Sequence, residues 1–230
     1  MGLLKYQFIE VPLELEEPIV SQKNGERYYK FPSANAEYPS VTTVTGIRSR
    51  QSIAKWRKKV GDEVANRIST RATKRGNAFH AIIEEYLKGT LNEQKYTNDP
   101  LALQLFKAAK PTLAKISNIH ALETPLYSHL FGLAGRVDCI ADFDGELAVI
   151  DFKTSTKEKQ VNWIENYFVQ ESAYAAMFLE RTGIGVKKIV TLIATEEGSI
   201  ELFQKYNLDD YLQLLKHYKE EFNALQEQRR

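Results

Sequence analysis

The chain has 230 residues, of which 43% are hydrophobic and 27% charged, and its formal net charge is +1. This composition is typical of a globular protein with one well-cored domain, and it excludes a disordered chain. No apolar run approaches the length of a membrane span, so we expect no membrane contact. The first six residues lack the pattern of a signal or transit peptide. Cys139 is the only cysteine, and we expect it to be a buried small hydrophobic residue.

The first part of the chain is predicted to pass from extended to helical structure. Residues 1–45 are expected to be extended, with a short strand at 28–31 after the Asn24-Gly25 turn. From Ser52 onward apolar residues recur with helical spacing, and Gly61 interrupts the pattern. The stripe consists of Ile53, Trp56, Val60, Val64 and Ile68. Its spacing favours a core position for Trp56 over stacking of its ring on a nucleic-acid base.

Two further helices are predicted before the strands begin. One follows Gly76 and stops at Gly89. The next begins at Asp99-Pro100, where aspartate is a good cap and proline a good first helical residue. Pro111 should kink or end that helix.

The second part of the chain alternates strands with helices. The expected order is strands at about 120–128, 134–143 and 146–153, a helix at 163–181 closed by Gly183, a hairpin at 188–194 and 199–206, and an amphipathic helix from Asp209. This order predicts an α/β sandwich with a mixed central sheet. We expect a single domain with three parts, namely a helical lobe at 45–118, an α/β core at 119–206 and a C-terminal helix at 207–230.

Basic residues are concentrated between Arg48 and Arg75. This segment carries ten Lys/Arg against two acidic residues, a charge of +8, so the rest of the chain carries −7. A local basic block on a nearly neutral protein is typical of a surface that follows phosphates. A solvated helical face is the ordinary alternative. The predicted nucleic-acid contacts are Arg57, Lys58, Lys59, Arg71, Lys74 and Arg75.

A hairpin predicted around Asp144-Gly145 is the most informative feature. Counting outward from this turn places Asp138 opposite Asp151, and Lys153 lies on the face of Asp151 with Arg136 across from it. The opposite face is apolar throughout. Two facing carboxylates repel each other unless a divalent cation binds both, and a lysine beside that cation can stabilise charge on a phosphate. We therefore predict a site for a divalent cation such as Mg²⁺, the alternative being an ordinary charged face on which Lys153 pairs with Asp151.

Several motifs resemble one family in their order along the chain. They are the Gly-x-x-Gly-x-x-Asp run at 132–138, the Asp-x-Lys-Thr-Ser run at 151–155, the Gln-x-x-x-Tyr pattern at 170–174, residues 38–44 and residues 76–80. Together they resemble the PD-(D/E)xK nuclease superfamily, in its RecB-like exonuclease branch. Within that branch they are similar to the mitochondrial genome maintenance exonucleases and to phage-encoded exonucleases. Val137 stands where the family often has proline.

The resemblance implies a restriction-endonuclease-like core, in which helices flank a mixed central sheet, with an N-terminal helical lobe. It also implies that His80 is a metal ligand, which would make Mn²⁺ a good substitute for Mg²⁺. The alternative is a histidine satisfied by hydrogen bonds in a packed interface. Glu123 would support the metal, unless it is a surface residue of an edge strand. Glu84, one turn from His80, is expected to be structural or to orient the His80 ring.

Four more residues are assigned to the site. Gln170 and Tyr174 share a helical face, and the resemblance gives them a catalytic role in arranging the site and the substrate backbone. Thr154 and Ser155 are predicted to donate hydrogen bonds to a phosphate, the alternative being simple termination of the strand.

The resemblance predicts a metal-dependent DNA exonuclease that prefers single-stranded DNA or strand ends, in DNA replication, recombination, repair or phage DNA metabolism. The helices at 48–75 would form an arch or wall that guides the strand. The expected location is the reducing cytoplasm of a bacterium or a phage-infected host cell. Two alternatives stay open, a structure-specific or restriction-type endonuclease on the same fold and a non-catalytic DNA-binding subunit, although the intact Asp138, Asp151 and Lys153 disfavour the latter.

Overall fold

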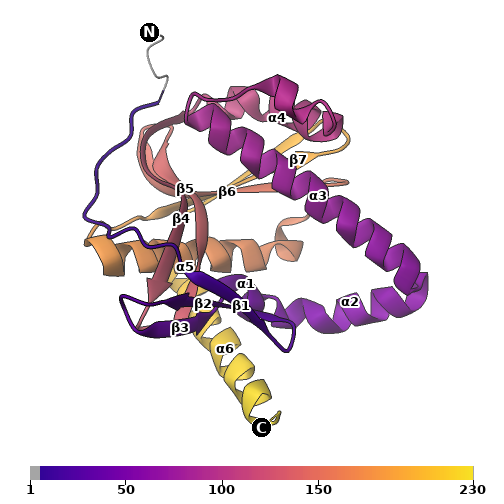
Figure 1. Ribbon diagram of the computed structural model, residues 1–230, viewed down its shortest axis with the longest axis vertical. Coiled ribbons are helices and arrows are strands. Elements are labelled where there is room, and N and C mark those ends of the chain that lie inside the picture. The colour runs from indigo at the N-terminus through magenta and orange to yellow at the C-terminus, as the bar shows by residue number, and fades with distance from the viewer. Residues whose placement is uncertain (1–5, 230) are drawn as a thin grey trace.

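A computed structural model describes residues 6–229 and shows two sheets surrounded by helices (Figure 1). The larger sheet has the strand order β4-β5-β6-β7-β8, and its pairs are antiparallel except for the parallel pair β6–β7. The predicted mixed central sheet is therefore confirmed. The prediction that the first six residues form no signal or transit peptide falls mainly on residues 1–5, which lie outside the described residues. The five strands are β4 (Ile116–Ser128), β5 (Leu133–Phe143), β6 (Glu146–Ser155), β7 (Lys188–Thr195) and β8 (Ile200–Lys205).

Helices cover both faces of this sheet. On one face, α3 (Asp62–Leu87) and α4 (Pro100–Leu113) bury Phe79 and Phe106 against Ile150 and its neighbours. On the other face, α5 (Glu165–Thr182), with α6 (Leu208–Glu227) packed beside it, buries Phe168 against Ile140. Both faces of the β5–β6 hairpin are consequently buried, so any charged side chain between them must find a partner.

The β5–β6 hairpin follows the predicted register only as far as Cys139–Ile150. Asp144 and Gly145 adopt φ angles of 54° and 81°, as a two-residue hairpin turn requires, and pairing runs outward from Phe143–Glu146. Beyond Cys139–Ile150 the ladder stops, and the backbone N–H of Phe152 donates to Asp138 Oδ2 at 2.8 Å.

Two predicted cross-strand neighbours are therefore corrected. Asp138 and Asp151 are not a ladder pair, and Arg136 pairs with Pro125 of β4 rather than facing Lys153. The physical reason is that the Asp138 carboxylate accepts a hydrogen bond from the backbone N–H of Phe152 on β6. β6 meanwhile continues its pairing with β7. The two strands thus separate beside Asp138.

The helices before the sheet differ from the prediction in two respects. A single helix, α3, runs through Gly76, where a new helix was predicted to begin. The helix passes β6 at this point, where a Cβ atom on Gly76 would lie at an ordinary contact distance of 3.9 Å from Thr154 Oγ1. The apolar stripe that begins at Ile53 was expected to face the core, but it does not. α2 (Ile47–Val60) has no buried residue, and Ile53 is half exposed. The core position predicted for Trp56 is wrong.

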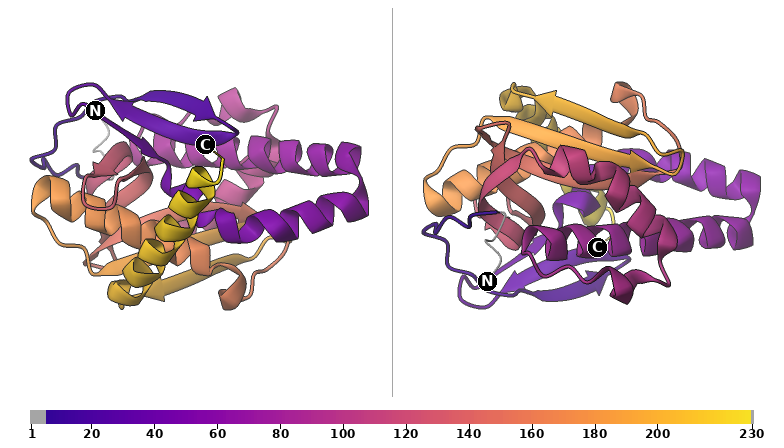
Figure 2. Two further views of the ribbon diagram at one scale, coloured as in Figure 1. Left: turned by 90° about the horizontal axis from the view of Figure 1, so that it is seen from below. Right: turned by 90° about the horizontal axis from the view of Figure 1, so that it is seen from above.

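Figure 2 shows that α2 and the first half of α3 project beyond the rest of the molecule as two adjacent helices. The short helix α1 (Val41–Thr45) precedes them. The second half of α3 instead belongs to the main core. The division into lobe, core and C-terminal helix stays a prediction, and the structure places part of the lobe in the core layer.

The N-terminal residues form a second sheet that sequence reasoning recognised only in part. The Asn24-Gly25 turn and the strand around 28–31 are present, but two neighbouring strands were missed. The preceding segment runs beside β4, where the Ile9 N–H donates to the Ile119 carbonyl and the Ile119 N–H donates to the Gln7 carbonyl. The three strands, in the order β1-β2-β3, are β1 (Ile19–Lys23), β2 (Glu26–Phe31) and β3 (Ala36–Pro39).

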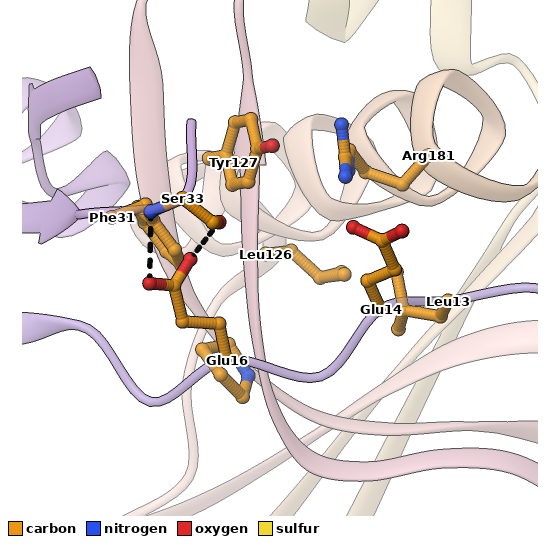
Figure 3. Close-up of a pocket in the computed structure, with 9 residues that line it drawn as sticks. Leu13, Glu14, Glu16, Phe31, Ser33, Leu126, Tyr127 and Arg181 are labelled. Carbon is orange, nitrogen blue, oxygen red and sulfur yellow. Dashed lines mark hydrogen bonds between the residues drawn. The ribbon is translucent and has the colours of Figure 1, made fainter. Parts of the chain in front are cut away.

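A small pocket lies between this N-terminal segment and β4 (Figure 3). There the Glu16 carboxylate accepts hydrogen bonds from the backbone N–H and the hydroxyl of Ser33. The pocket offers only about 10 Å³, which holds at most one water molecule. The hydrogen bonds from Ser33 to Glu16 hold the N-terminal segment against the second sheet.

The remaining elements follow the predicted order. In α4, Pro111 lies inside the helix, which continues only to Leu113. α5 ends as expected at Gly183, whose φ of 75° is left-handed. Two short 3₁₀ helices, η1 (Glu93–Tyr96) and η2 (Val161–Trp163), complete the fold. Among residues 6–229, no helix combines the length and apolar character that crossing a membrane would need.

β5 and α5 approach each other most closely at Gly135 and Tyr174. A Cβ atom on Gly135 would lie 2.6 Å from the Tyr174 hydroxyl oxygen and 2.8 Å from a ring carbon. The Tyr174 side chain is buried, with only 3% of its surface exposed. The second glycine of the Gly-x-x-Gly-x-x-Asp run is therefore required by packing.

We expect Gly135→Ala to lower the free energy of unfolding by about 1–3 kcal/mol, because the methyl group overpacks a buried ring. Urea denaturation followed by circular dichroism measures this change. Gly185→Ala is the matched control, since nothing lies within 4 Å of its Cβ position, and it should shift stability by less than about 1 kcal/mol. Equal effects of the two substitutions would contradict the packing role of Gly135.

Candidate active site

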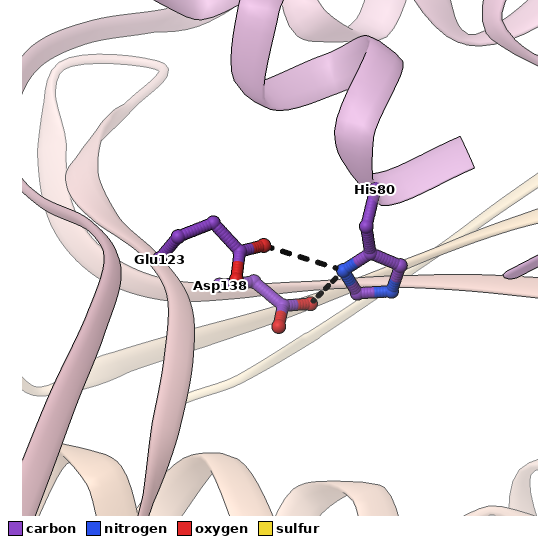
Figure 4. Close-up of side chains that lie close together, drawn as sticks. All are labelled: His80, Glu123 and Asp138. Carbon is purple, nitrogen blue, oxygen red and sulfur yellow. Dashed lines mark ion pairs between the residues drawn. The ribbon is translucent and has the colours of Figure 1, made fainter. Parts of the chain in front are cut away.

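Three elements bring together a group of side chains that suits a metal ion. His80 of α3, Glu123 of β4 and Asp138 of β5 place one ligand atom each within 4.8 Å of the others (Figure 4). His80 Nδ1 lies 3.5 Å from Glu123 Oε1 and 3.5 Å from Asp138 Oδ2. Two carboxylates and an imidazole form a donor set that accepts Mg²⁺ or Mn²⁺.

The positions of these side chains follow from the fold. α3 packs on the sheet with the His80 ring against Phe152, the residue whose N–H binds Asp138. Glu123 stands between the ladder pairs Leu122–Cys139 and Thr124–Val137, so it faces Asp138. Its φ of 47° is left-handed, a conformation that costs a non-glycine residue about 1–3 kcal/mol and that clusters at functional sites.

Asp151 and Lys153 of β6 lie beside this group, on the side of α5. Their side chains form an ion pair, and Asp151 is only 2% exposed. Lys153 Nζ also lies 5.3 Å from the centre of the Tyr167 ring. The alternative predicted from sequence, an ion pair between the two, is thus present next to the metal group. Asp151 is not part of the three-residue group, and its role as a ligand stays a prediction.

Gln170 and Tyr174 extend the site along α5, as the shared helical face predicted. Gln170 Nε2 lies 3.5 Å from Asp151 Oδ1, at the long limit of a hydrogen bond. Burial raises the pKa of Tyr174 well above its usual range, and Asp138 adds to this, whereas a hydrogen bond with Gln170 opposes it. Gln170 therefore links the buried tyrosine with the carboxylate of Asp151.

Charges compensate each other closely within the site. Burial by itself lowers the pKa of His80, but the Asp138 charge and a hydrogen bond with Glu123 outweigh it and raise the pKa to about 9. Burial raises the pKa of Asp151 to about 6, against the opposing effect of Lys153. Burial lowers the pKa of Lys153, yet Asp151 and Asp138 hold it above its usual value. Without a metal, a proton on His80 balances the carboxylates, and a divalent cation can take over this task.

Sequence reasoning missed one buried carboxyl group near the site. Glu171 is fully buried on α5, and the Thr191 hydroxyl donates to its Oε1, while its Oε2 has no partner among residues 6–229. Burial, followed by the charge of Asp151, raises its pKa well above the ordinary value. The raised pKa favours the neutral form of Glu171 beside Asp151. Its only sequence signal is its place inside the Gln-x-x-x-Tyr pattern.

Thr154 and Ser155 have partners within the protein. Arg75 Nε donates to Thr154 Oγ1 at 3.0 Å, and Arg75 also forms an ion pair with Glu196. The Ser155 hydroxyl donates to the Lys157 carbonyl at 2.6 Å, which favours the predicted alternative of strand termination. Arg75 is buried, so its position argues against the direct phosphate contact that the sequence predicted.

The other predicted phosphate contacts divide into two groups. Arg57 pairs with Asp62, Arg71 with Glu196 and Lys74 with Asp99. Within the described part of the chain, Lys58 and Lys59 form no ion pair and are exposed. These two lysines are the best candidates for phosphate contacts on the projecting helices. Glu84 binds Lys88 at 2.6 Å rather than His80, in agreement with a structural role.

Comparison with known proteins identifies the class. Residues 102–229, more than half of the chain, match the PD-(D/E)XK nuclease superfamily. The protein belongs to this superfamily, so the resemblance based on its motifs is confirmed. Its mixed sheet flanked by helices is the restriction-endonuclease-like fold. The matched residues contain Glu123, Asp138, Asp151 and Lys153 but not His80 or the projecting helices.

The chain is also similar to individual proteins. The chain is 25% identical over 138 residues to mitochondrial genome maintenance exonuclease 1 of Homo sapiens and 27% identical over 138 residues to that of Mus musculus. Each alignment covers 56% of this chain and 40% of the relative, so the chain spans less than half of these proteins. A solved structure, "Putative exonuclease" from Eubacterium rectale, is similar with a TM-score of 0.45 and 16% identity, over 64% of each chain.

We expect His80→Ala to weaken Mn²⁺ binding on the order of 10-fold or more, because it removes one of three ligand atoms. Isothermal titration calorimetry without DNA measures this affinity. His217→Ala, which removes an exposed histidine of α6, is the control and should leave Mn²⁺ binding unchanged. A loss of stability in His80→Ala with unchanged Mn²⁺ affinity would instead show that His80 is a packing residue.

Proposed function

We propose that the protein is a metal-dependent DNA exonuclease that acts on single-stranded DNA or on strand ends, with Mg²⁺ or Mn²⁺ as cofactor. The observation that carries this proposal is the convergence of His80, Glu123 and Asp138 beside the Asp151–Lys153 pair. Superfamily membership supports phosphodiester hydrolysis, and the exonuclease relatives support action on DNA. We further propose a role in DNA replication, recombination, repair or phage DNA metabolism, in the cytoplasm of a bacterium or an infected host cell.

Each residue of the site has a task in this reaction. His80, Glu123 and Asp138 would hold the metal, and Asp151 would join them once its carboxylate is shared between Lys153 and the ion. A bound divalent cation polarises the phosphate and lowers the pKa of a coordinated water. Lys153, which is charged at neutral pH, stabilises the negative charge that grows on the attacked phosphate. Gln170 orients the Asp151 carboxylate from α5.

The projecting helices support a preference for a single strand. α2 has 14 residues and is therefore about 21 Å long. It carries Lys58 and Lys59, which form no ion pair among residues 6–229, and the helix that follows it, α3, carries His80. A strand bound along this projection would reach the metal group without crossing the hydrophobic core. This arrangement supports the proposal that α2 and the first half of α3 form an arch or wall, which the free end of a DNA strand must pass to reach the metal group.

The central test compares end-labelled linear single-stranded DNA with closed circular single-stranded DNA, with and without Mg²⁺ or Mn²⁺. Linear strands should shorten progressively from an end while circles resist, because a circle has no end to thread. EDTA should abolish cleavage, and Asp151→Asn or Lys153→Ala should reduce it by at least about 100-fold with the fold retained. Nicking of circles at the rate of linear strands would show an endonuclease on the same fold. Cleavage that survives EDTA and both substitutions would refute the metal-dependent site.

A second prediction concerns the basic projection. We expect Lys58→Gln with Lys59→Gln to lower the slope of log K against log salt by about 0.7 for each lost phosphate contact on single-stranded DNA. Fluorescence anisotropy with a labelled oligonucleotide at several salt concentrations measures the slope. The control replaces Lys187 and Lys216, two exposed lysines outside this segment, and removes the same charge. If both double variants change the slope equally, Lys58 and Lys59 only solvate the helix.

A further inference from the structure

The backbone of Glu123 leaves the regular strand pattern beside the metal group. Its φ of 47° is left-handed, and ladder pairs are present on either side of it, at Leu122–Cys139 and at Thr124–Val137, but not at Glu123 itself. A carbonyl group turned out of a ladder needs another donor, because an unpaired buried backbone group is costly. The carbonyl of Glu123 finds this donor in a side chain of the neighbouring strand.

That donor is Arg136 of β5. Its Nη1 donates to the Glu123 carbonyl oxygen, and its Nη2 lies 2.5 Å from Oε2 of Glu17 in the N-terminal segment. Arg136 stands two residues before Asp138 on β5, and its side chain reaches β4 at the residue that lies between the pairs Leu122–Cys139 and Thr124–Val137. The guanidinium group therefore crosses to β4 next to the place where Glu123 faces Asp138.

The contact with Glu17 does not explain why an arginine stands here. Glu17 is 74% exposed, and such an exposed ion pair contributes little stability. The contact with Glu123 is specific, because the planar guanidinium donates in two directions at once, which an ammonium group on a flexible stem does less well. The Thr124 hydroxyl supports the same backbone turn by donating to the Leu122 carbonyl and accepting from the Leu122 N–H.

We propose that Arg136 is a positioning residue of the metal site: it holds Glu123 in the left-handed conformation that directs its carboxylate toward His80 and Asp138. This inference rests on the proposed metal-dependent function. It assigns Arg136 an action through the Glu123 backbone rather than on the substrate, because both guanidinium ends already have acceptors in the protein. Partners that orient metal ligands usually change metal affinity by about 10- to 100-fold when they are removed.

The test measures Mn²⁺ affinity by isothermal titration calorimetry in the absence of DNA. Arg136→Met keeps the length of the side chain but removes its donors, and it should weaken Mn²⁺ binding by about 10-fold or more. In a Glu123→Gln background, the same substitution should cause little further loss, because Arg136 acts through Glu123. Glu17→Gln is the control and should leave the Mn²⁺ affinity unchanged. Thermal unfolding without metal checks that each variant is folded, and if Arg136→Met does not fold, Arg136→Gln decides by the same measurement.

The outcomes separate this inference from the proposed function. If the unsubstituted protein binds Mn²⁺ but folded Arg136→Met binds it equally well, the positioning role is refuted and the metal site stands. The role is also refuted if Mn²⁺ affinity is unchanged while DNA affinity falls, since Arg136 would then contact the substrate directly. It is refuted as well if the losses from Arg136→Met and Glu123→Gln add fully, because the two residues would then act independently. If the unsubstituted protein binds no Mn²⁺, the metal site itself is refuted, and with it the role of Arg136.

Discussion

The separation of β5 from β6 is the constraint on which the site depends. Their ladder ends at Cys139–Ile150, because the Asp138 carboxylate accepts the N–H of Phe152 in place of the regular backbone bond. In a continuous ladder, carboxylates on one sheet face would meet groups from one helix layer only. Because the strands part here, His80 can approach from α3 while Gln170 approaches from α5 on the other face.

Burial and charge are balanced inside this gap. Asp151 is almost fully buried, which would favour its neutral form, and Lys153 offsets that effect with a full positive charge. Burial, followed by the charge of Asp151, raises the pKa of Glu171, which favours its neutral form. The proton held on His80 completes the balance in the metal-free protein. A divalent cation held by Glu123 and Asp138 would take over the positive charge that this proton supplies.

One rigid element joins the projecting helices to the site. α3 begins in the projection, passes β6 at Gly76 and carries His80 one turn later. Arg75 fastens the helix at this crossing through Thr154 and Glu196. Lys58 and Lys59 lie on α2, which meets α3 at Gly61, so the projection is joined to the site through α3. This arrangement gives the buried Arg75 a structural purpose that its charge alone did not indicate.

The sequence by itself determined the features that arise within a few residues: the hairpin register set by Asp144-Gly145, the end of α5 at Gly183, and the motifs that carry Asp138, Asp151 and Lys153. Turn chemistry and side-chain alternation act locally, so these could be read directly. The tertiary structure decided the gap between β5 and β6, the left-handed Glu123, the passage of α3 through Gly76 and the pairing of Arg75 with Glu196. Each of these depends on groups from different elements, such as Arg75 and Thr154, 79 positions apart, and local pattern holds no information about such contacts.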